Sequence, residues 1–94
     1  MAIEITGIRK PGGAWNTAEA ISHYRWVEDG TANRGITDRL TVVDWLEHRG
    51  ITAYVADNSQ QVWCEVRQNQ HGTKFLQTVA DGRETNNLLS LPEC

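Results

Sequence analysis

The fold of this chain is decided by residues 52–79, which read TAYVADNSQQVWCEVRQNQHGTKFLQTV. Three stretches rich in β-branched and aromatic residues, at 52–56, 61–68 and 73–79, alternate with short polar segments. Links this short join antiparallel neighbours, because a parallel crossover needs roughly a dozen residues or more. We therefore expect an antiparallel meander of three strands.

Alternation within the middle stretch assigns its two faces. Successive side chains of a strand point to opposite sides of the sheet. Val62, Cys64 and Val66 therefore point one way and are expected to face the core. Trp63 and Arg67 share the opposite face, which is the face available for binding.

The first half of the chain contributes up to two more strands. Residues 3–9 alternate with a period of two, and residues 21–28 are rich in β-prone side chains and stop at Asp29-Gly30. Residues 31–37 contain Gly, Asn and Arg with a single apolar residue, so we expect a surface loop there.

A short helix is expected to begin at Thr41. Thr41 and Asp44 fit a variant of the capping box, in which the Thr hydroxyl accepts a backbone N–H and the carboxylate returns the bond. Gly50 can adopt the left-handed conformation that ends helices. After the Asp81-Gly82 turn, residues 88–92 are expected to pack down as a tail.

Size and composition describe one globular unit. The chain has 94 residues, of which 39% are hydrophobic and 22% charged, which is typical of a folded domain. We predict a single α+β domain over residues 1–94, with a small antiparallel sheet of four or five strands and one short helix packed on one face.

Charge and cysteine content indicate which partners and which cellular compartment to expect. A net charge of -3 and a pI near 5.5 make generic nucleic-acid binding unlikely. No apolar stretch approaches the roughly 18 residues of a membrane helix, and no leader pattern opens the chain, so we expect no membrane contact. Only Cys64 and Cys94 are present, which favours a reducing, cytoplasmic setting over a disulfide framework.

The sequence carries no recognisable catalytic or metal motif. The histidines and cysteines lack the close spacings that preorganise zinc ligands, so we predict no metal and no cofactor. Ser22 and His23 are neighbours in a predicted strand and should point to opposite faces, which argues against a nucleophile and base pair. Asp81, Glu84 and Asn86 are interpreted as turn and cap residues.

Aromatic residues of the meander give the first binding hypothesis. Trp63 and Arg67 share a face, and Tyr54 and Phe75 on the flanking strands can extend an aromatic strip beside them. Such a strip could stack a base or a partner side chain. In the alternative interpretation, the rings lie in a second small core, covered by the tail residues Leu88, Leu89 and Leu91.

A second group of aromatic residues lies in the first half of the chain. Trp15, Tyr24 and Trp26, together with Arg25, could line a groove for a protein partner or a homodimer, since interfaces are enriched in Trp, Tyr and Arg. In the alternative interpretation, Trp26 fills the core and only Trp15 is exposed.

Several segments together resemble a known family. The chain is similar to the domain of unknown function family 3892, a group of small uncharacterised bacterial proteins, at residues 41–46, 53–55, 73–78, 80–82 and 87–92. In that family an Asp commonly precedes the Asn-Leu-Leu segment, where this chain has Asn86. The resemblance implies a bacterial or phage-associated cytosolic protein with an α+β fold, and it supplies no catalytic residues.

These observations order three functional hypotheses. The first is a noncatalytic binding module that contacts a protein partner, of a regulatory or phage-host type. The alternative is a small-ligand or nucleotide binder that uses the aromatic strip. A small enzyme of unknown reaction is the third.

Overall fold

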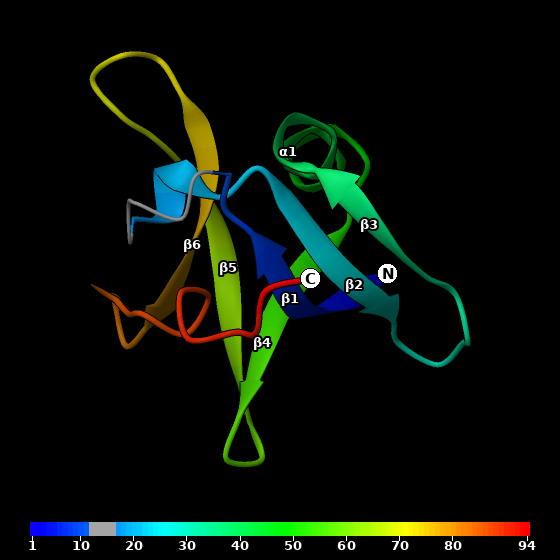
Figure 1. Ribbon diagram of the computed structural model, residues 1–94. Coiled ribbons are helices and arrows are strands. Elements are labelled where there is room, and N and C mark those ends of the chain that lie inside the picture. The colour runs from blue at the N-terminus through cyan, green and yellow to red at the C-terminus, as the bar shows by residue number, and fades with distance from the viewer. Residues whose placement is uncertain (12–16) are drawn as a thin grey trace.

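The computed structural model describes residues 1–11 and 17–94 of the chain, and this part is an α+β unit built on one mixed sheet (Figure 1). The sheet has seven strands in the order β3-β2-β1-β4-β5-β6-β7, against the four or five that were expected. The described elements are β1 (Ala2–Arg9), the 3-10 turn η1 (Ala18–Ala20), β2 (His23–Glu28), β3 (Arg34–Asp38), α1 (Arg39–His48), β4 (Thr52–Asp57), β5 (Gln60–Gln68), β6 (Lys74–Ala80) and β7 (Arg83–Glu84).

The predicted meander is confirmed. β4 pairs with β5 and β5 pairs with β6, both antiparallel, with Val55 opposite Val62 and Val66 opposite Leu76. Val62 and Cys64 are buried, whereas Trp63 is exposed, as the alternation of side chains requires. β7 adds a short pairing to β6 across the Asp81-Gly82 turn.

The expectation of an entirely antiparallel sheet is wrong, because β1 pairs in parallel with β4. β2 already occupies one edge of β1, so β4 can join only at the other edge. The connection from β1 to β4 contains β2, β3 and α1, which is long enough to return the chain to its starting end.

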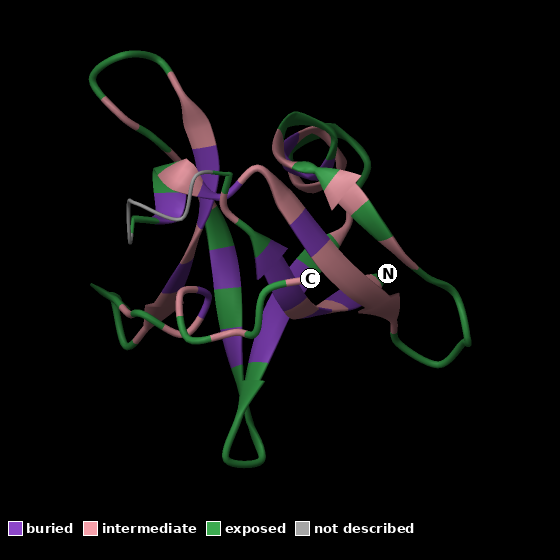
Figure 2. Cartoon of the chain, viewed as in Figure 1, coloured by how far each residue is buried: buried purple, intermediate pink, exposed green. Residues whose placement is uncertain are grey.

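The sheet curls until strands that are distant in its order meet. The backbone N–H of Leu76 on β6 donates to the Tyr24 hydroxyl of β2 at 3.3 Å, although β1, β4 and β5 lie between these strands. The inner face of the curl is therefore enclosed, and Figure 2 shows the buried residues gathered there. The core residues are Ile3, Ile5, Ile8, Ile21, Tyr24, Val42, Val43, Ala53, Val55, Cys64, Leu76 and Leu88.

Residues 34–38 form strand β3, although a loop was expected over residues 31–37. An edge strand needs few apolar residues, because one of its sides has no neighbouring strand. Gly35 suggested a loop, but its role is packing: a Cβ there would lie 3.2 Å from Cζ2 of Trp26. The indole Nε1 of Trp26 donates to the Thr37 hydroxyl at 2.9 Å, which fixes the ring against β3.

The helix begins at Arg39, and its cap is Asp38, three residues before the predicted cap Thr41. The Asp38 carboxylate accepts the backbone N–H of Thr41 at 3.1 Å and its hydroxyl at 2.8 Å. These bonds favour the ionised carboxylate and lower the pKa of Asp38. Val42 and Val43 face the core, and Gly50 has the expected positive φ of 68°.

The C-terminal tail packs down and continues the edge of β1. Leu88 is 2% exposed, and Leu89 and Leu91 pack against the core. β4 pairs with β1 only as far as Glu4, and further along the same edge of β1 the tail pairs with Ile8 (Figure 1). The N–H of Ile8 donates to the carbonyl of residue 92 at 3.0 Å, and the N–H of residue 94 donates to the carbonyl of Ile8 at 2.9 Å.

We expect Leu88→Ala to lower the free energy of unfolding by about 2–5 kcal/mol, because it leaves a cavity in a closed core. The matched control is Leu40→Ala, since Leu40 is 61% exposed and its truncation should cost about 0.5 kcal/mol or less. Urea unfolding followed by circular dichroism measures both. Equal effects of the two substitutions would contradict the tail packing described above.

Candidate functional site

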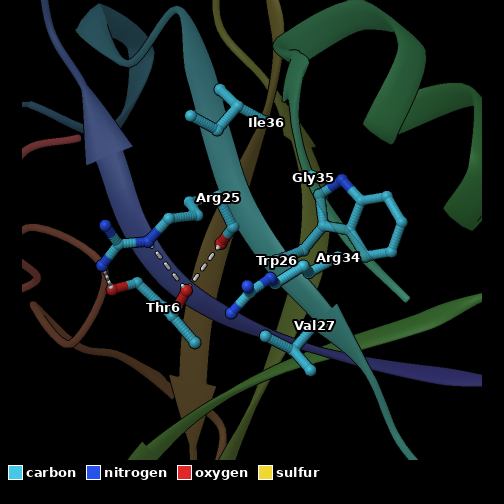
Figure 3. Close-up of a pocket in the computed structure, with 7 residues that line it drawn as sticks. All are labelled: Thr6, Arg25, Trp26, Val27, Arg34, Gly35 and Ile36. Carbon is cyan, nitrogen blue, oxygen red and sulfur yellow. Dashed lines mark hydrogen bonds between the residues drawn. The ribbon is translucent and has the colours of Figure 1, made fainter. Parts of the chain in front are cut away.

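A pocket of about 390 Å³ opens on the outer face of the curled sheet, over β1, β2 and β3. Side chains of β2 alternate, so that Tyr24 and Trp26 point inward while Arg25 and Val27 point outward. Figure 3 shows how Arg25, Trp26 and Val27 lie along this strand. We call this site the arginine pocket. It is lined by Thr6, Arg25, Trp26, Val27, Arg34, Gly35 and Ile36.

Arg25 is held in place by β1. Its Nε donates to the Thr6 hydroxyl at 3.1 Å and its Nη2 to the Thr6 carbonyl at 3.0 Å. Gly7 is paired with Arg25 in the sheet, and a Cβ at that glycine would lie 3.0 Å from the guanidinium carbon. Glycine therefore lets the guanidinium lie close over the β1 backbone, where its two hydrogen bonds to Thr6 hold it.

The pocket carries positive charge that is not balanced locally. No carboxylate lines it, and neither Arg25 nor Arg34 forms an ion pair with the residues that the structure describes. Ile36 is 46% exposed and adds apolar surface next to these cations. The combination suits a partner group that carries a carboxylate beside an apolar side chain.

The aromatic strip predicted on the meander shares one face, but only one of its rings is open. Tyr54 lies opposite Trp63, with ring centroids 5.3 Å apart, and Phe75 lies opposite Arg67. Tyr54 and Phe75 are buried, whereas Trp63 is 43% exposed. The tail leucines predicted to cover the rings instead pack against the main core.

Tyr54 is tied to the turn that follows β2. Its hydroxyl donates to Oδ1 of Asp29 at 2.6 Å. The hydrogen bond holds the proton on the phenol, and together with burial and the negative charge it raises the pKa of Tyr54 to about 12. The contact joins β4 to the β2–β3 connection and so fixes one end of the outer face.

The aromatic residues predicted as a second binding group, in the first half of the chain, do not share one surface. Tyr24 is fully buried and belongs to the core, so it offers no surface to a ligand. Trp26 is half-buried and meets Trp45 of α1 edge to face at 5.5 Å, while contributing to the rim of the arginine pocket. Arg25 lines that pocket, and Trp15 lies outside the described residues.

Sequence reasoning missed Thr6, Arg34 and Ile36. Arg34 and Ile36 fall in the segment assigned to a loop, because its single apolar residue gave no alternation of the kind that indicates a strand. Thr6 lies on the outer face with Glu4 by the regular alternation of β1, and the register shift between Ile5 and Gly7 brings Gly7 to the same face, opposite Arg25.

Ser22 and His23 approach one another, contrary to the expectation that they point apart. Ser22 Oγ and His23 Nδ1 are 2.8 Å apart, because β2 begins at His23 and strand alternation does not extend to Ser22. Asp38 is paired with His23 in the sheet, but its carboxylate accepts hydrogen bonds from Thr41. Within the described chain no carboxylate hydrogen-bonds to the imidazole, so the third member of a catalytic triad is missing.

Metal and thiol chemistry find little support in the described residues. No group of three His, Cys, Asp or Glu side chains within residues 1–11 and 17–94 is placed to hold a metal ion. Cys64 is buried, and burial raises the pKa of its thiol to about 12, which disfavours the reactive thiolate. Neither helical segment of the described chain has the length and apolar character needed to cross a membrane.

Comparison with known proteins identifies the family. The chain matches the family described as Protein of unknown function (DUF3892) over residues 4–92, and it belongs to that family. None of the curated proteins and none of the solved structures matches the chain. Residues 87–92, one of the segments that carried the resemblance, have structural roles: Leu88 enters the core, and Asn87 donates to the Asp57 carboxylate at 2.8 Å.

The raised pKa of Tyr54 yields a prediction for alkaline pH. Free tyrosine ionises near pH 10, so between pH 10 and 12 the unfolded chain releases a proton that the folded chain keeps. The contribution of Tyr54 to stability is therefore complete below pH 10 and is lost as the pH rises towards 12.

We expect Asp29→Asn to move the ionisation of Tyr54 back towards its ordinary value. Absorbance of tyrosinate during an alkaline titration measures the shift, and Tyr54→Phe identifies the step that belongs to this residue. An unchanged ionisation step in Asp29→Asn would show that the hydrogen bond to Asp29 is not its cause.

Proposed function

We propose that the protein is a noncatalytic binding module that contacts a protein partner through the arginine pocket. The observation that carries this proposal is the Arg25 guanidinium, which is held by Thr6 over Gly7 and faces no carboxylate among the described residues. A cation already fixed in one position loses little conformational entropy when it binds an anion.

The surroundings of Arg25 favour a protein over a small molecule. Val27 and Ile36 place apolar surface beside the cation, and this mixture is characteristic of the arginine-rich centre of protein interfaces. The expected partner supplies an Asp or Glu to Arg25 and an apolar side chain to Ile36. Small-ligand or nucleotide binding rests on the one open ring, Trp63, and stays a prediction from the sequence.

We expect Arg25→Glu to abolish capture of the partner, because it places a carboxylate where the partner's carboxylate should bind. The matched control is Arg83→Glu, which makes the same charge change at an exposed position on β7, the far end of the strand order. Tagged forms of the protein are incubated with a soluble proteome, and bound proteins are quantified by mass spectrometry. Melting temperatures verify that both variants are folded.

Support requires a protein retained by the unmodified chain and by Arg83→Glu but lost from Arg25→Glu. Arg25→Lys should bind with intermediate strength, because lysine keeps the charge but cannot reproduce the two hydrogen bonds to Thr6. Full capture by Arg25→Glu would contradict the site. A nucleotide that raises the melting temperature, with no protein captured, would favour the small-ligand alternative.

A further inference from the structure

Strand β3 forms one edge of the sheet and exposes part of its backbone. The N–H of Arg39 donates to the carbonyl of Ser22, and the N–H of Glu28 donates to the carbonyl of Asn33, both at 2.8 Å. These bonds lie at the two ends of the β2–β3 ladder, and they show which residues of the two strands form its hydrogen-bonded pairs. In an antiparallel ladder the hydrogen-bonded pairs recur at every second residue.

The positions of these pairs determine which groups of β3 are free. The hydrogen-bonded pairs between those two ends are Tyr24 with Thr37 and Trp26 with Gly35. Ile36, which lies between Gly35 and Thr37, therefore directs its N–H and carbonyl away from β2. No other described strand pairs with this edge, so both groups of Ile36 are open to a further strand.

The side chains along this edge are arranged symmetrically about Ile36. Arg34 and Asp38 lie two residues before and two residues after Ile36, and alternation places all three on the outer face. All three are exposed, and Arg34 forms no ion pair with the described residues. A two-fold axis at Ile36 would place Arg34 of each copy opposite Asp38 of the other.

We infer that β3 pairs with β3 of a second copy of this chain, in antiparallel register centred on Ile36. The two Ile36 residues exchange their free backbone hydrogen bonds, and their side chains meet on the outer face. Two Arg34–Asp38 pairs flank this contact and select the register, since a shift would break both pairs. The two sheets then become one continuous sheet, a closed two-fold arrangement.

The inference is independent of the partner proposed for Arg25, but the two surfaces are neighbours. Arg34 and Ile36 line the arginine pocket as well as the edge, so dimerisation would place two pockets beside one another on a common outer face. The other edge is a weaker candidate, because β7 has only two residues, Arg83 and Glu84, and few backbone groups to offer.

Charge exchange tests the register directly. In sedimentation velocity over a concentration series, the unmodified chain should form dimers, whereas Arg34→Glu and Asp38→Lys should each self-associate about tenfold more weakly, since two attractive pairs become repulsive. Mixing these two variants in equal amounts should restore dimers. In the mixed pair, the new glutamate faces the new lysine, and the unmodified Asp38 faces the unmodified Arg34.

Mixing also controls for a folding defect. Asp38 caps α1, so Asp38→Lys alone could lose dimers because its helix is disturbed. A misfolded chain would not restore dimers with Arg34→Glu, so rescue identifies the charge pairing as the cause. Arg83→Glu should leave the dimer intact, because it makes the same charge change as Arg34→Glu on β7, at the opposite end of the strand order.

The backbone contact is tested by Ile36→Pro, with Ile36→Ala as its control. Proline removes the N–H of Ile36, which β2 does not use, so the fold should persist as proline is tolerated on the free side of an edge strand. Ile36→Pro should abolish dimers, and Ile36→Ala should only weaken them. A monomeric unmodified chain at high concentration, or dimers that survive Ile36→Pro, would overturn the inference.

Discussion

The closure between β2 and β6 is the constraint on which the rest of the molecule depends. Tyr24 reaches across the inside of the curl, and its hydroxyl accepts the N–H of Leu76. A buried hydroxyl and a strand-edge amide would each cost free energy if left unpaired, so this one bond satisfies two groups at once. Because the curl encloses the inner face, the outer face and the free edges are the surfaces left for recognition.

The regular, half-buried strands could be predicted from the sequence, whereas their closure could not. Residues 52–79 alternate strongly and are joined by short turns, so local information was sufficient for β4, β5 and β6. The parallel pairing of β1 with β4 depends on how distant parts of the chain pack. The sequence predicted a loop where β3 lies, because an edge strand contains few apolar residues. Glycine also indicates a turn, whereas Gly35 is needed here for close packing against the indole of Trp26.

The candidate site, like the fold, could be predicted from the sequence only in part. Alternation correctly placed Trp63, Arg67, Tyr54 and Phe75 on one face, but it could not tell that two of the rings would be covered. Arg25 and Trp26 were identified from residue type, yet the fixed guanidinium depends on a register shift in β1 and on a glycine across the ladder. Residue type therefore indicated the region, and backbone geometry determined the site.

The seam between Ile8 and residues 92–94 links segments that are far apart in the sequence. Arg9 even reaches the carbonyl of Cys94, 85 positions further along the chain, with its Nε at 3.3 Å. On the ribosome, β1 and β2 can form a hairpin before the tail is made, but this seam stays open until residues 92–94 emerge. The two sides of the seam therefore become available at different times during synthesis.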